Sequence, residues 1–339
     1  MTLKELSALP GVSGDEGAVR DYILKIARVC GDVSTDALGN VIVRKKGLRD
    51  IGKTVMLCAH MDEVGFFITN FTEEGYLRFT EVGAIDRRAI VGKRVLVGKD
   101  KIPGIIGMKP VHLASKDEQS RVPEYSALYI DIGASSKEAA MARVSLGDTA
   151  VFDSPFFDMG NHKFIATRAI DDRAGCLAML HLLKENLPID VTFVFTVQEE
   201  IGLRGAQAAA ASVKPDIAFI LEGTTAADLP GVPAEKQVCQ LGKGVVIPFM
   251  DKGTVYDRGL YAEVTALAER LNIPWQTKTL VAGGTDAAVI QRSGSGARVL
   301  GLAVPVRNLH TGYTVARIDD CMHFLNLTRA ILADLGANA

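Results

Sequence analysis

Hydrophobic residues follow two kinds of pattern in this chain, and each pattern occupies its own part of the sequence. In residues 1–65 and 159–339, continuous apolar runs such as residues 54–59 and 191–197 alternate with segments of helical periodicity. Such runs are typical of strands buried on both faces, and their alternation with helices predicts a mostly parallel sheet. Between residues 66 and 158 the runs become short, alternating and broken by glycine, which is typical of a small β-rich domain.

These patterns predict an α/β protein of two domains. We expect a three-layer α/β/α sandwich formed by residues 1–65 and 159–339, interrupted by an inserted β-rich domain of PDZ-like or β-barrel type at residues 66–158. Ser13 and Glu16 have the spacing of a capping box and predict a helix that runs to about residue 29. The later elements expected are helices at 173–185, 205–211, 260–271 and from 318, and strands at 191–197, 216–221, 277–281 and 298–304.

Composition and charge exclude several classes of partner. Lys plus Arg number 38 and Asp plus Glu 40, a net charge of -2, so no broad basic field is available to hold nucleic acid or an anionic membrane. No 18 apolar residues run uninterrupted and the first residues include charges, so we expect a cytoplasmic protein. The 5 cysteines include no C-x-x-C pair, which argues against a disulfide framework or a thiolate zinc site.

Polar side chains follow the predicted buried strands where each strand ends, and further carboxylates precede the helix at 173–185. In open α/β sheets, ligands bind beyond the carboxyl ends of the strands, so we expect these side chains to meet there. Two imidazoles with several carboxylates and no thiolate are a ligand set for a divalent metal, most naturally zinc, cobalt or manganese. The side chains expected to meet here are those of His60, Asp62, Asp171, Glu199, Glu200, Glu222 and His310.

The number of ligands suits two ions. If Asp171 bridges them, one ion also takes His60 and Glu222, and the other takes Glu200 and His310. Without cations, so many carboxylates would repel one another.

Two acidic residues remain for other roles. Asp62 is spaced to accept the ring N–H of His60 that faces away from the metal, although an Asp that caps its own loop has the same spacing. The side chains of Glu199 and Glu200 diverge near a strand end, so one can coordinate while the other acts as a base. A pair of solvated glutamates is the alternative, which the strongly apolar strand before them disfavours.

The chain also resembles a known family, the tetrahedral, dodecameric dinuclear-metal aminopeptidases, which include glutamyl aminopeptidases and relatives described as endoglucanases. The resemblance extends from near residue 11 to beyond residue 310. The matching strings occupy residues 59–65, 129–138, 169–175, 198–206, 241–244, 283–286 and 307–310.

The resemblance implies a role for each residue. His60, Asp171 and Glu222 would hold one metal and Asp171, Glu200 and His310 the other, with Glu199 as general base and Asp62 orienting His60. The family more often has Asp where this chain has Glu222, so the assignment of Glu222 as a ligand is the one that departs from the family pattern. The resemblance further implies a cis peptide bond after Asp171 and a homo-oligomer, a dodecamer built from dimers through the inserted domain.

The function expected is therefore removal of N-terminal residues from peptides, with Glu199 taking a proton from a water that metal has acidified. A metal-dependent deacylase or amidase, a glycoside hydrolase and a noncatalytic binding protein are the alternatives. The sequence leaves open whether the preferred first residue of the peptide substrate is acidic, apolar or basic. Residues 283–286, Gly-Gly-Thr-Asp, are either a loop that approaches substrate or a turn with an N-cap before a helix.

Overall fold

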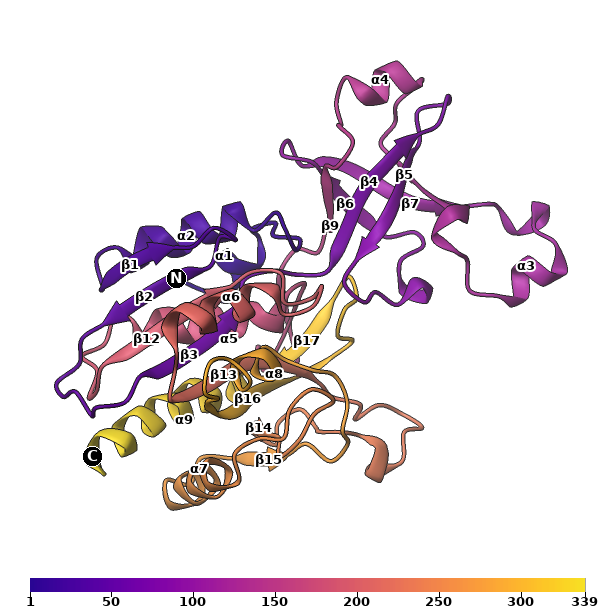
Figure 1. Cartoon of the computed structure of the whole chain (residues 1–339). Coiled ribbons are helices and arrows are strands. Elements are labelled where there is room, and N and C mark those ends of the chain that lie inside the picture. The colour runs from indigo at the N-terminus through magenta and orange to yellow at the C-terminus, as the bar shows by residue number, and fades with distance from the viewer. Residues whose placement is uncertain (339) are drawn as a thin grey trace.

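The larger of two β-structures in the computed structural model, which describes residues 1–338, is an 11-stranded mixed sheet (Figure 1). In pairing order its strands are β1 (Asp32–Thr35), β2 (Val41–Lys45), β12 (Val191–Thr196), β3 (Val55–His60), β13 (Ile217–Thr225), β16 (Arg298–Arg307), β17 (Thr314–Arg317), β11 (Phe164–Thr167) and β10 (Phe157–Met159). β14 (Val245–Ile247) pairs with β16 and with β15 (Trp275–Thr277).

The sheet is mixed, whereas the apolar pattern predicted a mostly parallel one. Its four central strands, β12, β3, β13 and β16, are parallel to one another. Most flanking strands pair antiparallel, as β1 does with β2 and β10 with β11, although β14 and β15 pair parallel. These flanking pairs are joined by short turns, which permit only antiparallel pairing, while parallel neighbours need a crossover. Four aligned carboxyl ends therefore still meet at one edge.

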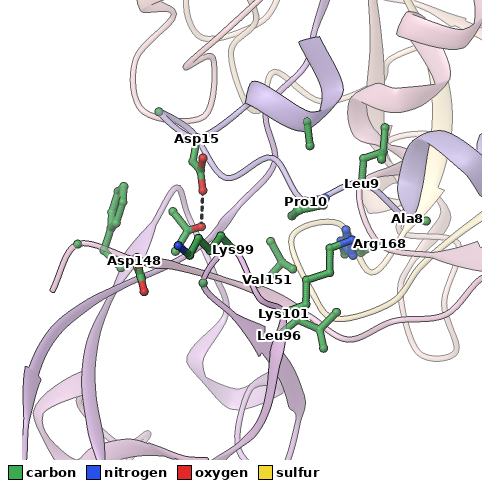
Figure 2. Close-up of a pocket in the computed structure, with 16 residues that line it drawn as sticks. Ala8, Leu9, Pro10, Asp15, Leu96, Lys99, Lys101, Asp148, Val151 and Arg168 are labelled. Carbon is green, nitrogen blue, oxygen red and sulfur yellow. Dashed lines mark hydrogen bonds between the residues drawn. The ribbon is translucent and has the colours of Figure 1, made fainter. Parts of the chain in front are cut away.

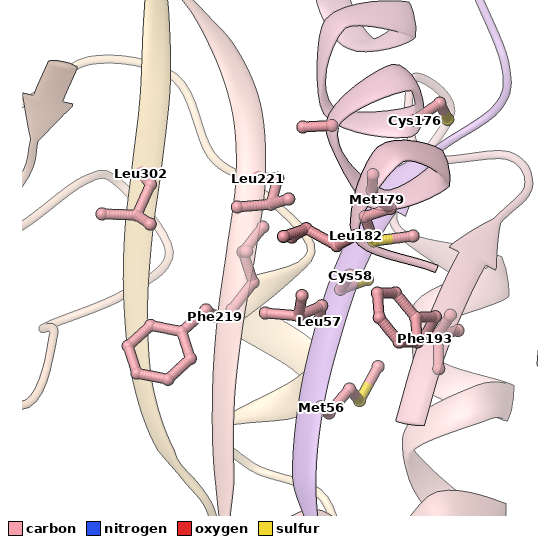
Figure 3. Packing of buried hydrophobic residues seen from close by; sticks show 14 of the residues in the cluster. Met56, Leu57, Cys58, Cys176, Met179, Leu182, Phe193, Phe219, Leu221 and Leu302 are labelled. Atoms are coloured by element: carbon pink, nitrogen blue, oxygen red, sulfur yellow. The ribbon is translucent and has the colours of Figure 1, made fainter. Parts of the chain in front are cut away.

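The central strands pack into an apolar core, as their apolar runs in the sequence predicted. Figure 3 shows Met56 and Leu57 of β3 with Phe193 of β12 and Phe219 of β13, which are buried. Met179 and other side chains of one helix approach the same strands. The helices outside the barrel are α1 (Leu3–Ser7), α2 (Gly17–Ala27), α5 (Ile170–Leu182), α6 (Arg204–Val213), α7 (Arg258–Arg270), α8 (Ala287–Ile290) and α9 (Ile318–Ala337), with a 3-10 turn η4 (Ala234–Lys236). Within residues 1–338, none of the helices has the length and apolar character of a membrane span.

The second β-structure is a closed barrel formed by the segment between β3 and β10. Its strands, in pairing order, are β4 (Gly65–Phe71), β5 (Leu77–Val82), β8 (Leu128–Asp131), β7 (Ile102–Met108), β6 (Arg94–Val97) and β9 (Thr149–Phe152). Its short helices are η1 (Arg87–Ala89), η2 (Val111–Leu113), α3 (Lys116–Ser120), η3 (Tyr125–Ala127) and α4 (Lys137–Met141). The barrel has its own core, in which Phe66 stacks edge-on against Phe79 and Phe152. Figure 1 shows the barrel standing away from the large sheet, with α3 on a projecting arm.

Polar contacts fix the barrel to the part of the chain that carries the large sheet. Thr149 Oγ1 of β9 donates a hydrogen bond to Asp15 Oδ2 at 2.6 Å, beside a cavity of about 550 Å³ between the two parts (Figure 2). Lys99 and Arg168 line the same cavity. Glu63, in the loop that leads into β4, forms a buried ion pair with Arg168 at 2.9 Å. These contacts hold the chain segments on either side of the barrel close to it.

Two local predictions were wrong. The capping box does not form, because Ser13 Oγ donates to Asp62 and Glu16 Oε1 accepts from the backbone of Gly14 and Gln198, and α2 begins one residue after Glu16. The strand expected at 277–281 is instead β15, which ends at Thr277. Beyond it, the backbone N–H and the hydroxyl of Thr279 both donate to the Val238 carbonyl, so this segment turns away from strand pairing.

Candidate metal centre

The ends of the central strands bring together the side chains that the sequence singled out. His60 is the last residue of β3, Glu222 lies within β13, and Glu199 and Glu200 follow β12. Asp171 lies at the start of α5, in a part of the helix with non-helical backbone angles. His310 follows β16 and has a positive φ of 56°. The candidates come from several elements and meet at the carboxyl edge of the sheet, as expected for a site of this fold class.

The first group of candidate ligands surrounds the Nε2 atom of His60. This atom lies 3.4 Å from Asp171 Oδ1 and 3.6 Å from Glu222 Oε2. The His60 side chain is 1% exposed and that of Glu222 is 6% exposed. An imidazole nitrogen and two carboxylate oxygens thus face one another in a space that water barely reaches.

The second group is more open and shares a residue with the first. His310 Nε2 lies 3.2 Å from Glu200 Oε1, and the His310 side chain is 27% exposed. His60, Asp171 and Glu200 each offer one ligand atom, and these atoms lie within 4.8 Å of one another. Asp171 is therefore close to both groups, which is the position that a bridging carboxylate needs.

Asp62 connects both sides of the centre. The nearest Asp62 atom to His60 Nδ1 is the backbone carbonyl oxygen, at 3.1 Å, while the carboxylate oxygen Oδ1 lies at 3.5 Å. The carboxylate accepts hydrogen bonds from the backbone N–H groups of Glu199 at 3.0 Å and Glu200 at 3.1 Å, and from Ser13 Oγ at 2.6 Å. Asp62 thus fixes the His60 ring with its main chain and the two glutamates with its side chain.

Burial and mutual repulsion perturb the acids of the cluster. Burial raises the pKa of Glu199 and of Glu222 well above the usual value, and the neighbouring carboxylates add to that rise. Burial on its own would lower the pKa of His60, but hydrogen bonds to Asp171 and Asp62 and the charge of Glu222 raise it well above normal. In the absence of a cation, the cluster therefore holds protons that it would not hold in water.

The residues present fit a divalent metal. Glu222 Oε1 is buried and has no hydrogen-bond partner, although the other carboxylate oxygen faces His60. An unpartnered buried carboxylate oxygen is costly unless a cation or a donor reaches it. The donors are imidazole and carboxylate, with no thiolate, which suits zinc, cobalt or manganese. Glu222, the ligand left open by the resemblance, reaches the cluster through Oε2.

Sequence reasoning did not assign two further buried acids. Asp172 accepts from the backbone N–H groups of Gly175 at 2.9 Å and His60 at 3.3 Å, and the Asp171–Asp172 peptide bond is cis, as the resemblance implies. Asp286 does not cap α8 with its side chain; it accepts from Thr196 Oγ1 at 2.6 Å, and burial raises its pKa to about 6. Both acids lie within strings that match the family, but only three-dimensional contacts reveal what they hold.

A cavity of about 360 Å³ opens onto the cluster. Its lining includes Asp171, Glu199, Glu200, Glu222 and His310, the same residues that carry the candidate chemistry. Val238, Lys278, Leu309 and residues 282–285 also line this cavity. The loop of residues 283–286 therefore approaches the cavity, as one of the two interpretations of its sequence required.

Comparisons with known proteins agree with this geometry. Residues 39–327 match the model of the M42 glutamyl aminopeptidase family. A lysyl aminopeptidase from Pyrococcus furiosus is 31% identical, with 98% of this chain and 96% of the relative covered. A glutamyl aminopeptidase from Lactococcus lactis is 30% identical, with 98% of this chain and 95% of the relative covered.

Solved structures give the same result. An aminopeptidase from the archaeon Desulfurococcus kamchatkensis superposes with a TM-score of 0.92 and is 34% identical, covering 97% of this chain and 93% of that one. The TET1 peptidase of Pyrococcus horikoshii, which can assemble into a tetrahedron or a large octahedral shell, has a TM-score of 0.86 and is 36% identical, covering 97% and 98%. Fold, cluster and relatives together define a peptide hydrolase with a candidate metal centre. The chain belongs to the M42 glutamyl aminopeptidase family.

The raised pKa values predict that protons and metal compete for the cluster. Groups whose pKa is raised stay protonated to higher pH, and binding a cation must release those protons. We expect the affinity of the metal-free protein for Zn²⁺ to rise as pH rises through these pKa values. Calorimetry in buffers of different ionisation enthalpy should show protons released on binding.

A Glu222→Gln variant provides the matched comparison, because glutamine has the same shape but carries no titratable proton. It should release about one proton fewer per chain and bind metal more weakly. An affinity of the wild type that does not change with pH would contradict the proton competition.

Proposed function

We propose that this aminopeptidase uses two divalent ions, held by His60, Asp171 and Glu222 on one side and by Asp171, Glu200 and His310 on the other. The observation that carries this proposal is that Asp171 lies close to both histidine-containing groups, at 3.4 Å from His60 and within the same set of ligand atoms as Glu200. The unpartnered Glu222 Oε1 supports the first set. Zinc is the ion we favour, with cobalt or manganese as the alternatives.

The proposed chemistry divides between metal and protein. Divalent ions bound here would acidify water and polarise the scissile carbonyl group. Glu199 is not needed as a ligand; its backbone is held by Asp62, and its carboxylate lines the cavity. Its raised pKa suits a general base, which must accept a proton from the attacking water and pass it to the leaving amine. Asp62 is the positioning residue for this base and for His60.

Family membership favours removal of N-terminal residues over the other reactions considered. A deacylase or amidase would use the same water chemistry, and a glycoside hydrolase would need two carboxylates placed across a sugar rather than gathered around imidazoles. A noncatalytic protein would have no need of Glu199 in the cavity beside an intact ligand set.

Replacing the proposed base tests the mechanism. Glu199→Gln should lower turnover of an unblocked peptide by about 10² to 10⁴-fold, because glutamine cannot take up the proton. The metal content, measured by elemental analysis, should stay at the wild-type level. The control is Glu269→Gln, an exposed residue of α7 that should leave turnover unchanged. Near-normal turnover by Glu199→Gln contradicts the role of Glu199.

We propose further that residues 66–158 form a discrete domain that mediates assembly into a dodecamer built from dimers. The arm around α3 carries exposed apolar side chains, including Val111 at 66% and Leu113 at 64% exposure. Apolar side chains gathered on a projecting segment are typical of a surface that a partner covers. The assembly of the Pyrococcus horikoshii relative into closed shells supports the same proposal.

The mass of the particle tests this assembly. Twelve chains of 36.3 kDa give a dodecamer of about 436 kDa, which light scattering separates from smaller species. The double variant Val111→Asp, Leu113→Asp should shift the mass towards dimers or monomers. Val29→Asp is the control, because Val29 is 85% exposed but lies after α2 on the other part of the chain. A double variant that keeps the wild-type mass excludes the arm from the interface.

A further inference from the structure

The cavity of about 550 Å³ between the barrel and the large sheet, which we call the barrel–sheet cavity, is lined by three basic side chains. Lys99 and Lys101 lie in the turn between β6 and β7 of the barrel, and Arg168 follows β11 of the large sheet. Among the described residues, none lines both this cavity and the one at the metal centre. A space of this size can hold a small organic molecule, and the proposed peptide chemistry makes no use of it.

The guanidinium group of Arg168 is buried and only partly paired. Its Nε atom donates to Glu63 Oε2 at 2.9 Å, and Nη1 donates to the Phe152 carbonyl oxygen at 3.4 Å. The Nη2 atom is buried and has no hydrogen-bond partner. A buried N–H group without an acceptor costs free energy, which an acceptor oxygen supplied by a ligand would recover. Phosphate and carboxylate oxygens are the acceptors that guanidinium groups bind best.

The charge of Arg168 is also only partly compensated, because Glu63 serves two arginines. Glu63 Oε2 accepts from Arg168, while Oε1 accepts from the backbone N–H of Gly11 at 3.1 Å and lies 3.4 Å from Arg173 Nη2. Within residues 1–338, neither guanidinium group has a second carboxylate within 4.0 Å. One carboxylate between two buried cations leaves an excess of positive charge beside the cavity, which an anion in the cavity would compensate.

Lys99 and Lys101 bring two further cations to the same space. Both side chains are exposed, and neither forms an ion pair with another described residue. Their turn is held in place, because the Gly98 N–H donates to the Thr149 carbonyl at 2.8 Å and the Lys101 N–H donates to the Gly98 carbonyl at 3.0 Å. Figure 2 shows the Lys101 side chain directed toward Arg168. Each ammonium group has three N–H donors to offer to a ligand.

Two acids in the lining, Asp15 and Asp148, do not cancel these cations. The Oδ2 atom of each already accepts a hydrogen bond, from Thr149 Oγ1 at 2.6 Å in Asp15 and from a backbone N–H at 2.8 Å in Asp148. Figure 2 shows both acids away from Arg168. When the two lysines, the two arginines and Glu63 are counted as well, cations outnumber carboxylates around the cavity. The charge of the site therefore favours an anion.

We propose that the barrel–sheet cavity binds a phosphate group through Arg168, Lys101 and Lys99. Three cations with free donors suit a dianion with several acceptor oxygens better than a singly charged carboxylate. Leu9 and Leu96 also line the cavity, so the group can belong to a small organic phosphate as well as to free phosphate. Because the cations come from both the barrel and the large sheet, the bound phosphate joins these two parts of the molecule.

Calorimetry on the metal-loaded protein at low salt tests this site. Inorganic phosphate should bind at about one equivalent per chain with a dissociation constant of about 1 mM or lower, and acetate should bind about tenfold more weakly. Phenyl phosphate carries the same group on an apolar ring. If it binds more tightly than inorganic phosphate, the apolar wall contributes and the ligand is an organic phosphate, and if it binds more weakly, the ligand is free phosphate.

The variants replace the exposed lysines, since loss of the buried Arg168 would leave Glu63 poorly paired and could unfold the protein. Lys101→Met should weaken phosphate binding about tenfold, and the double variant Lys99→Met, Lys101→Met should weaken it further. Without phosphate, both should keep the wild-type melting temperature. Lys236→Met is the control, because Lys236 is an exposed lysine of η4 that does not line the cavity. It should leave the dissociation constant unchanged.

A phosphate ion could also bind to metal at the catalytic centre, and Asp171→Ala separates the two sites. Phosphate in the barrel–sheet cavity should still bind to this variant, whereas phosphate held by metal should be lost with the metal. Binding that Asp171→Ala removes and the lysine variants keep contradicts the proposal. A wild type that binds phosphate more weakly than about 10 mM, or that binds acetate as tightly as phosphate, contradicts it as well.

Discussion

Mutual repulsion among buried carboxylates is the constraint around which this molecule is organised. Asp171, Glu200 and Glu222 lie within a few ångströms of two imidazoles, and Glu222 has an oxygen with no partner at all. Protons can relieve the repulsion, as the raised pKa of Glu222 indicates, but then the site has little chemistry to offer. Divalent cations would relieve the repulsion while leaving the imidazoles neutral and the carboxylates charged. In that state the side chains can hold the cations, and bound cations acidify water.

The fold holds this cluster through interactions just outside it. The loop after His60 supplies Asp62, which binds the backbone of Glu199 and Glu200, and Glu63, which pairs with Arg168 and accepts from Gly11 N at 3.1 Å. Arg173, fully buried in α5, lies 3.4 Å from the same Glu63 and donates to the Leu6 carbonyl. Adjacent residues of one short loop therefore connect the metal ligands, the helix that carries Asp171 and the N-terminal segment. In metal sites, residues that contact the ligands but not the metal hold the ligands in position in this way.

Sequence reasoning predicted the central strands and the candidate ligands because both depend on local patterns. A strand such as β3 is apolar throughout and ends at His60, so its burial and its direction follow from the sequence. The antiparallel flanks, the true partners of Ser13 and Glu16, and the end of β15 at Thr277 depend on contacts between distant segments, which no local pattern encodes. Lys278 was missed for the same reason: one lysine among many becomes informative only when the chain places it in the cavity beside the cluster.

The bridging position of Asp171 is the central claim, and metal stoichiometry tests it most directly. Elemental analysis of the loaded and desalted protein should give about two ions per chain for the wild type. Asp171→Ala should give fewer than one, since the loss of a shared ligand weakens both ions, while its melting curve shows a folded protein. A wild type that holds a single ion, or a folded Asp171→Ala variant that keeps two, would contradict the account.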